Sequence, residues 1–124
     1  MPATNKKPAA RRKSVAMYQP DLERMSKKDL RALQLGRLQK TVRHAYRNVA
    51  AVRDKFDAAG VKPADLKSLK DIAKFPFARK SDLRDNYPLG LFAVPQDKLV
   101  RVHGSSGTTG KPTIVGYSKK DMKN

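Results

Sequence analysis

Two short β-type segments, separated by a loop with no apolar side chain apart from one proline ring, constrain the fold of the C-terminal part of this chain. The segments run from Leu99 to Val102 and from Thr113 to Tyr117, and both are rich in β-branched and aromatic residues. The nine residues from Gly104 to Pro112 join them and contain three glycines and four hydroxyl side chains. We therefore predict two strands, in an antiparallel pair, connected by a polar loop. Two strands alone make a poor sheet, so further structure is needed to support them.

The central part of the sequence has helical periodicity. From Asp21 to Asn48, apolar residues recur at spacings of three and four, and on a 3.6-residue wheel they share one face. They are Leu35, Leu38, Val42, Tyr46 and Val49. Ser26, followed by Asp29, is predicted to cap the start of this helix. His44 falls on the opposite, charged side of the helix, so we interpret it as a surface residue rather than a ligand or a base.

Several shorter helices are expected after this one. A second helical stretch ends at Gly60, a residue suited to the left-handed conformation just past a helix end. Ser68 to Asp71 has capping-box spacing and opens a short helix, and Ser81 or Asp82 caps another. The same spacing at Ser118 to Asp121 has only three residues after it, so we expect a helix that is cut off within a larger fold.

The charge of the chain is strongly basic. The 28 Lys and Arg residues outnumber 11 Asp and Glu, which gives a formal net charge of +17. Residues 1–20 hold three prolines and no apolar periodicity, and we predict a disordered basic tail. Polyanions are natural partners of such a chain, but no nucleic-acid-binding signature or interleaving of basic and aromatic residues is present. Specific nucleic-acid binding is therefore not expected.

Composition also limits the cellular setting. The chain has no cysteine, which excludes disulfides and thiolate chemistry and fits a reducing compartment. No apolar run approaches the roughly 20 residues that cross a bilayer. We expect a cytoplasmic protein with no membrane partner and no metal ligands of its own.

The polar loop has the chemistry of an anion site. Glycines at 107 and 110 permit close approach of backbone N–H groups, the hydroxyls add donors, and Lys111 adds a mobile positive charge. Five residues separate Gly104 from Gly110, and a proline follows the lysine, so the loop is not a Walker A motif. By composition alone, a phosphate site and an unliganded Gly/Ser/Thr hairpin loop are equally open.

A family resemblance favours the phosphate site. The run Ser105-Ser106-Gly107-Thr108-Thr109-Gly110-Lys111-Pro112-Thr113 resembles the phosphate-binding motif of the adenylate-forming superfamily. The flanking segments 75–77, 80–88, 90–95 and 115–117 are similar to phenylacetate-CoA ligases in particular, and the likeness runs from about Leu30 to Asp121. It implies an α/β fold, with residues 21–124 forming the truncated N-terminal portion of the AMP-binding adenylation domain: short helices, then two strands flanking the loop.

The resemblance also implies a reaction and its participants. A carboxylic acid such as phenylacetate would be activated with ATP to an acyl-adenylate and then transferred to CoA, with magnesium assisting. The residues implied to bind the nucleotide phosphates are Ser105, Ser106, Gly107, Thr108, Thr109, Gly110 and Lys111. No catalytic residue is expected in this chain, which needs the remainder of the ligase, and we expect it to be inactive alone. His103 abuts the loop, but a strand-end histidine that faces neighbouring side chains is the favoured interpretation.

Two alternatives from other classes remain open at this level. The chain could be a small basic protein that grips nucleic-acid phosphates nonspecifically, or an inactive gene remnant. These residues indicate neither which acid is the substrate nor the oligomeric state.

Overall fold

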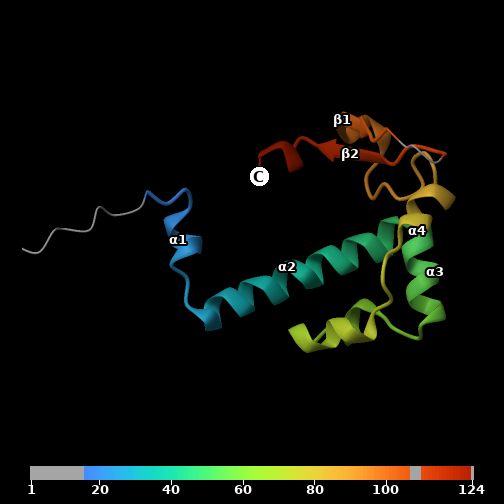
Figure 1. The fold of residues 1–124 in the computed structure, drawn as a ribbon. Coiled ribbons are helices and arrows are strands. Elements are labelled where there is room, and N and C mark those ends of the chain that lie inside the picture. Colours follow the sequence, from blue (N-terminus) through green and yellow to red (C-terminus); the bar gives the residue numbers. More distant parts are fainter. Residues whose placement is uncertain (1–15, 107–109, 124) are drawn as a thin grey trace, which may run out of the picture.

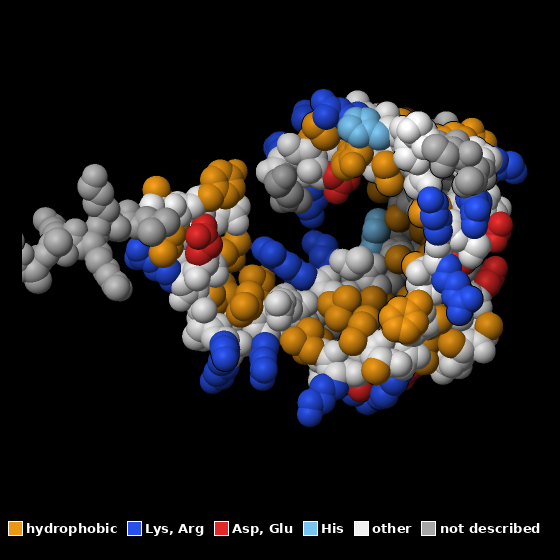
Figure 2. All heavy atoms as spheres, viewed as in Figure 1, with side chains coloured by type: hydrophobic (Ala, Val, Ile, Leu, Met, Phe, Trp, Pro, Cys, Tyr) orange, Lys and Arg blue, Asp and Glu red, His pale blue; other side chains and the backbone are white. Residues whose placement is uncertain are grey.

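The computed structural model describes residues 16–106 and 110–123, in which helices precede a two-stranded sheet. Residues 1–15 of the predicted tail, which was expected to span residues 1–20, lie outside this range. In Figure 1 the helices and the hairpin meet at one end of the molecule, near α4, and diverge toward the other. Figure 2 shows the same face hollowed between them. No helix in the described part is long and apolar enough to cross a membrane.

The expected helix from Asp21 to Asn48 is divided into two, α1 (Pro20–Glu23) and α2 (Lys27–Asn48). The division falls at Ser26, whose backbone is extended and whose hydroxyl oxygen accepts the N–H of Asp29 at 3.1 Å. This confirms the predicted cap. The helical pattern that begins at Asp21 forms two elements rather than one, because a capping residue has non-helical backbone and so ends any helix that precedes it.

The end of α3 (Ala50–Ala58) follows the sequence prediction closely. Gly60 has φ +68°, and its N–H donates to the carbonyl of Asp57 at 3.0 Å. The N–H of Val61 donates to the carbonyl of Phe56, also at 3.0 Å. These are the two bonds of a Schellman motif, which satisfies carbonyls that the helix leaves unpaired and turns the chain back toward α2.

The core is small and lies between α2, α3 and the segment that follows them. Its most deeply buried side chain is Leu66, at 1% exposure, and Leu35, Leu38 and Phe56 pack around the buried cluster. The buried members of the cluster are Val42, Val61, Leu66 and Phe75. Gln39 ties α2 to this segment by donating from its side-chain amide to the Leu66 carbonyl at 2.8 Å. The predicted apolar face of α2 is thus confirmed, and His44 is exposed as expected.

A polar triad fixes α3 against α2 beside this core. The Tyr46 hydroxyl donates to Asp57 Oδ1 at 2.8 Å, and Lys62 Nζ donates to the same oxygen at 2.6 Å. The hydrogen bond from Lys62, with a smaller one from Tyr46, holds the pKa of Asp57 below its usual value. The triad joins the C-terminal part of α2 to both ends of the Gly60 turn.

Short helical turns connect the core to the hairpin. Turns of 3-10 helix cover Pro63–Asp65, Leu69–Lys74 and Gln96–Lys98, and α4 covers Lys80–Asp85. The predicted cap at Ser81 or Asp82 was wrong in position. Asp82 lies at the third residue of α4 and reaches back to accept the N–H of Arg79 at 2.7 Å. It also pairs with Lys55 Nζ at 2.6 Å, so α4 is bound to α3.

The two predicted strands form an antiparallel hairpin of β1 (Leu99–Gly104) and β2 (Ile114–Ser118). The register is irregular between Leu99 and Arg101, where Val100 is an extra residue without a partner. A side chain on Gly116 would have its Cβ 2.9 Å from the Phe92 ring, so glycine lets this ring lie against the sheet. A 3-10 turn, Asp121–Lys123, follows. The expected Ser118–Asp121 cap is confirmed, because the N–H of Ser118 donates to Asp121 Oδ2 at 2.8 Å and the N–H of Asp121 donates to the Ser118 hydroxyl oxygen at 3.4 Å.

Candidate phosphate-binding loop

The hairpin brings the two ends of the predicted loop together. Gly104 pairs with Ile114 at the last position of the ladder. Beyond it, the N–H of Ser105 donates to the carbonyl of Thr113 at 3.0 Å, and the N–H of Thr113 donates to the hydroxyl oxygen of Ser105 at 3.2 Å. The Ser105 hydroxyl therefore closes the base of the loop. Its own hydrogen is not engaged by this bond, so it can still donate to an anion.

Glycine is favoured at two positions of the loop for different structural reasons. Gly110 has φ +119°, a region that L side chains rarely adopt, so a glycine is required there. Gly104 lies beside Ile114, and a Cβ on it would be 3.3 Å from the Cδ1 atom of that side chain. Gly110 therefore has open space around it, whereas Gly104 lies close to Ile114, and neither residue places a side chain at the ends of the loop.

Lys111 is the charged member of the set and is exposed. Its ammonium lies 5.7 Å from the centroid of the Tyr87 ring, which belongs to the segment after α4. Ser105, Ser106, Gly110 and Lys111 are thus brought to one end of the hairpin. The remaining predicted members, Gly107, Thr108 and Thr109, lie outside the described residues, and the phosphate-binding role of the whole set stays a prediction.

His103 belongs to the face of the hairpin rather than to the loop. Its ring packs edge-on against the Tyr117 ring, with 5.3 Å between centroids. This is the arrangement expected for a strand-end histidine that faces its neighbours. Tyr87 was not predicted as a site residue, because no sequence spacing links it to Lys111, which is 24 positions later.

Within residues 16–106 and 110–123, no three His, Asp or Glu side chains come close enough together to hold an ion.

Comparison with known proteins shows which solved structures have a similar fold. No family model matches the chain. A solved structure of 2-hydroxyisobutyryl-CoA ligase in complex with 2-HIB-AMP and CoA superposes with a TM-score of 0.76 at 38% identity, over 82% of this chain and 23% of that one. An open conformation of the same enzyme gives 0.74 at 35% identity. By fold, the chain is similar to part of these adenylate-forming CoA ligases and corresponds to an incomplete portion of their α/β fold.

Within that class, the chain is a relative of the phenylacetate-CoA ligases. It is 65% identical over 101 residues to that enzyme from Aromatoleum evansii, 53% over 107 residues to that from Thermus thermophilus, and 56% over 103 residues to that from Escherichia coli. These matches cover 82–86% of the chain but only 23–24% of each relative. The chain therefore spans about a quarter of the length of the curated relatives it matches.

Proposed function

We propose that this chain is the part of a phenylacetate-CoA ligase that binds the β- and γ-phosphates of ATP. The observation that carries the proposal is the loop base: a glycine-bounded turn closed by Ser105 and Thr113, which brings Ser106, Gly110 and Lys111 to one edge. Hydroxyl donors, close backbone and one ammonium are what a polyphosphate requires. The 53–65% identity to ligases of this name supports the same conclusion.

The chemistry follows from where charge develops. In the first step, a carboxylate oxygen of the acid bonds to the α-phosphorus of ATP, the bond to the bridging oxygen of the β-phosphate breaks, and pyrophosphate leaves. Lys111 and the loop donors would hold those departing oxygens as their negative charge grows, which lowers the barrier electrostatically. In the second step, the sulfur of CoA bonds to the acyl carbon, the thiol proton is lost, and AMP leaves.

The remaining participants follow from the same proposal. When bound, magnesium would neutralise phosphate charge. We propose phenylacetate or a related aryl acetate as the acid and the cytoplasm as the location. Because the chain spans about a quarter of its relatives, we further propose that these 124 residues alone do not form acyl-CoA. Phenylacetyl-CoA produced from the purified chain, ATP, magnesium, CoA and phenylacetate would contradict this.

Binding of inorganic pyrophosphate to the 124-residue chain tests the loop directly. We expect Lys111→Met to weaken binding about 10- to 100-fold, because a hydrogen bond to a charged group contributes roughly 1.5–3 kcal/mol. Lys119→Met is the matched control, since it removes the same charge from an exposed lysine at the far end of β2. Isothermal titration calorimetry at fixed ionic strength measures both. Equal weakening by the two variants would mean general attraction to a basic surface and would refute the loop site.

Nonspecific nucleic-acid binding is the competing function, and it rests on the net charge of +17 alone. Deletion of residues 1–20 separates the two proposals. Loss of duplex-DNA binding with unchanged pyrophosphate binding would assign the former to the tail. Tight duplex binding at physiological salt that survives the deletion would favour the nucleic-acid function instead.

A further inference from the structure

The Lys111 ammonium lies over the face of an aromatic ring from another segment. Its distance of 5.7 Å from the Tyr87 centroid is within the roughly 6 Å at which a cation is attracted by a ring face. The ion pairs of the described residues do not include Lys111. Tyr87 is therefore the contact that the structure gives to this charge, and the two residues are 24 positions apart in the sequence.

The backbone at Tyr87 is fixed by hydrogen bonds from both directions. Its N–H donates to the carbonyl of Arg84 at 3.2 Å, at the end of α4. Next to it, the side-chain amide of Asn86 donates to the carbonyl of Asp82 at 2.9 Å, and the carbonyl of Asn86 accepts the N–H of Gly90 at 2.8 Å. A Cβ on Gly90 would stand 2.8 Å from that carbonyl oxygen, so the turn is close. Tyr87 is thus mounted on α4, which the ion pair with Lys55 binds to α3.

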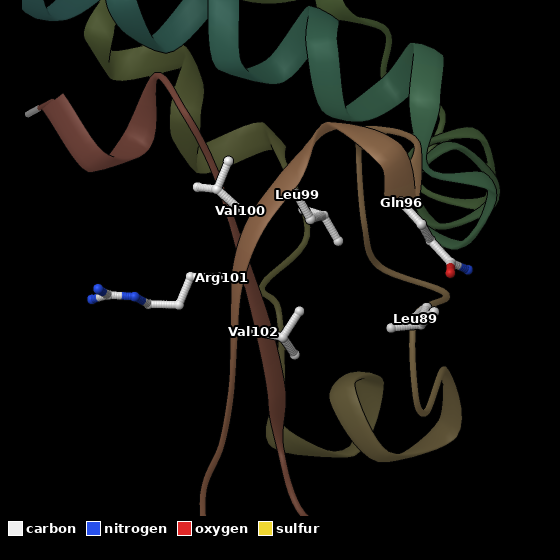
Figure 3. A pocket seen from close by; sticks show the side chains of 6 residues that line it. All are labelled: Leu89, Gln96, Leu99, Val100, Arg101 and Val102. Carbon is white, nitrogen blue, oxygen red and sulfur yellow. The ribbon is translucent and has the colours of Figure 1, made fainter.

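The other side of the same turn faces the hairpin. Leu89 lines a pocket of about 370 Å³ together with residues before and within β1. The lining residues are Leu89, Gln96, Leu99, Val100, Arg101 and Val102. Figure 3 shows Leu89, Leu99 and Val102 directed toward the same space, while Arg101 points away from it. The turn that carries Tyr87 therefore lies beside the strand that leads into the loop.

We propose that Tyr87 is a positioning residue that holds the Lys111 ammonium at the loop for an incoming phosphate. This rests on the phosphate-binding function proposed above. A lysine has a flexible four-carbon stem, and a freely moving ammonium loses that freedom when it binds an anion. The ring confines the ammonium before the anion arrives. It does so through its face and without a carboxylate, so the positive charge is not neutralised and the N–H groups remain available to phosphate oxygens.

Nuclear magnetic resonance of the ligand-free chain tests the contact by itself. Protons held over a ring face are shifted upfield, so we expect the ε-methylene protons of Lys111 to be shifted relative to those of Lys119. Tyr87→Phe keeps the ring and should keep the shift, whereas Tyr87→Leu should abolish it. Identical positions in all three proteins would overturn the contact, whatever the chain binds.

Pyrophosphate titrations then test positioning. We expect Tyr87→Phe to bind within error of the original chain and Tyr87→Leu to bind about two- to fivefold more weakly, the range expected of one exposed cation–π contact. Thermal unfolding of both variants checks that neither effect comes from lost structure. Equal affinities for the two variants, or tighter binding by Tyr87→Leu, would overturn positioning.

A double-mutant cycle distinguishes positioning from a direct effect of the ring. In a Lys111→Met background, replacing Tyr87 by Leu or by Phe should give the same pyrophosphate affinity, because the ring has no ammonium to hold. A difference that persists there would show that Tyr87 acts by another route, and the proposal would fail while the loop site stands. Absence of pyrophosphate binding by the unmodified chain would instead refute the proposed function, and positioning for phosphate with it.

Discussion

Leu66→Ala is the sharpest test of the small core. Leu66 is 1% exposed and belongs to the cluster with Val42, Val61 and Phe75, so truncation removes fully buried methyl groups and leaves a cavity in packed surroundings. Such changes cost about 2–5 kcal/mol. Complete native domains have free energies of unfolding of only about 5–15 kcal/mol, and the core of this chain is small. We therefore expect the variant to lose a large share of its stability.

Urea unfolding followed by far-ultraviolet circular dichroism measures this loss. Leu30→Ala is the matched control, because it removes the same atoms from α2 at a position that is 38% exposed. We expect less than about 1 kcal/mol there. If both variants shifted the midpoint equally, with unchanged slopes, the cluster around Leu66 would not be the core and the reasoning would be refuted.

Further substitutions examine the turns, the sheet and the ionised groups. Gly60→Ala should destabilise by about 1–2 kcal/mol because of its φ of +68°, whereas Gly36→Ala, inside α2 with open space around it, should stabilise by about 0.5–1 kcal/mol; urea midpoints that move in the same direction would contradict this. Gly116→Ala should cost about 1–3 kcal/mol, since the new Cβ would meet an aromatic ring at 2.9 Å; faster hydrogen exchange of the hairpin amides would report it, and unchanged exchange would exclude the contact. The hydrogen bond from Lys74 is the largest cause that lowers the pKa of Asp71 in the folded chain. The ionised Asp71 carboxylate should therefore contribute its full stabilisation above the unfolded-state pKa of about 3.9. This stabilisation should decline as the pH falls toward the lowered folded-state pKa. Asp71→Asn should reduce the unfolding free energy at neutral pH and flatten its dependence on pH in acid; a parallel curve would contradict the assignment.

Sequence reasoning succeeded where a local rule determines the outcome. The spacing of Leu35, Leu38 and Val42 identified the buried face of α2, because helical periodicity alone decides which side chains share a face. Ser26 and Gly60 identified helix ends for equally local reasons, a side-chain acceptor and a left-handed backbone. The antiparallel hairpin followed from two β-type segments with a polar loop between them.

The errors and omissions involve longer-range or competing interactions. The start of α4 was displaced because Asp82 caps from inside the helix and pairs with Lys55, a residue 27 positions earlier. The extra residue Val100 depends on how two strands pair, which neither strand shows alone. The contact of Tyr87 with Lys111 needs α4, its turn and the hairpin to be placed together, so the candidate site was incomplete without the structure.

The hairpin has a consequence for how the chain behaves with other chains. In the part of the chain that the structure describes, β1 and β2 bond only to each other, so each presents an outer row of unpaired N–H and C=O groups. Such a row is a template on which another strand can grow a sheet. Exposed Arg101 within β1 and Lys119 directly after β2 place like charges beside that template, and two copies aligned edge to edge would bring those charges together. Self-association of this chain should therefore increase with salt concentration, which screens that repulsion.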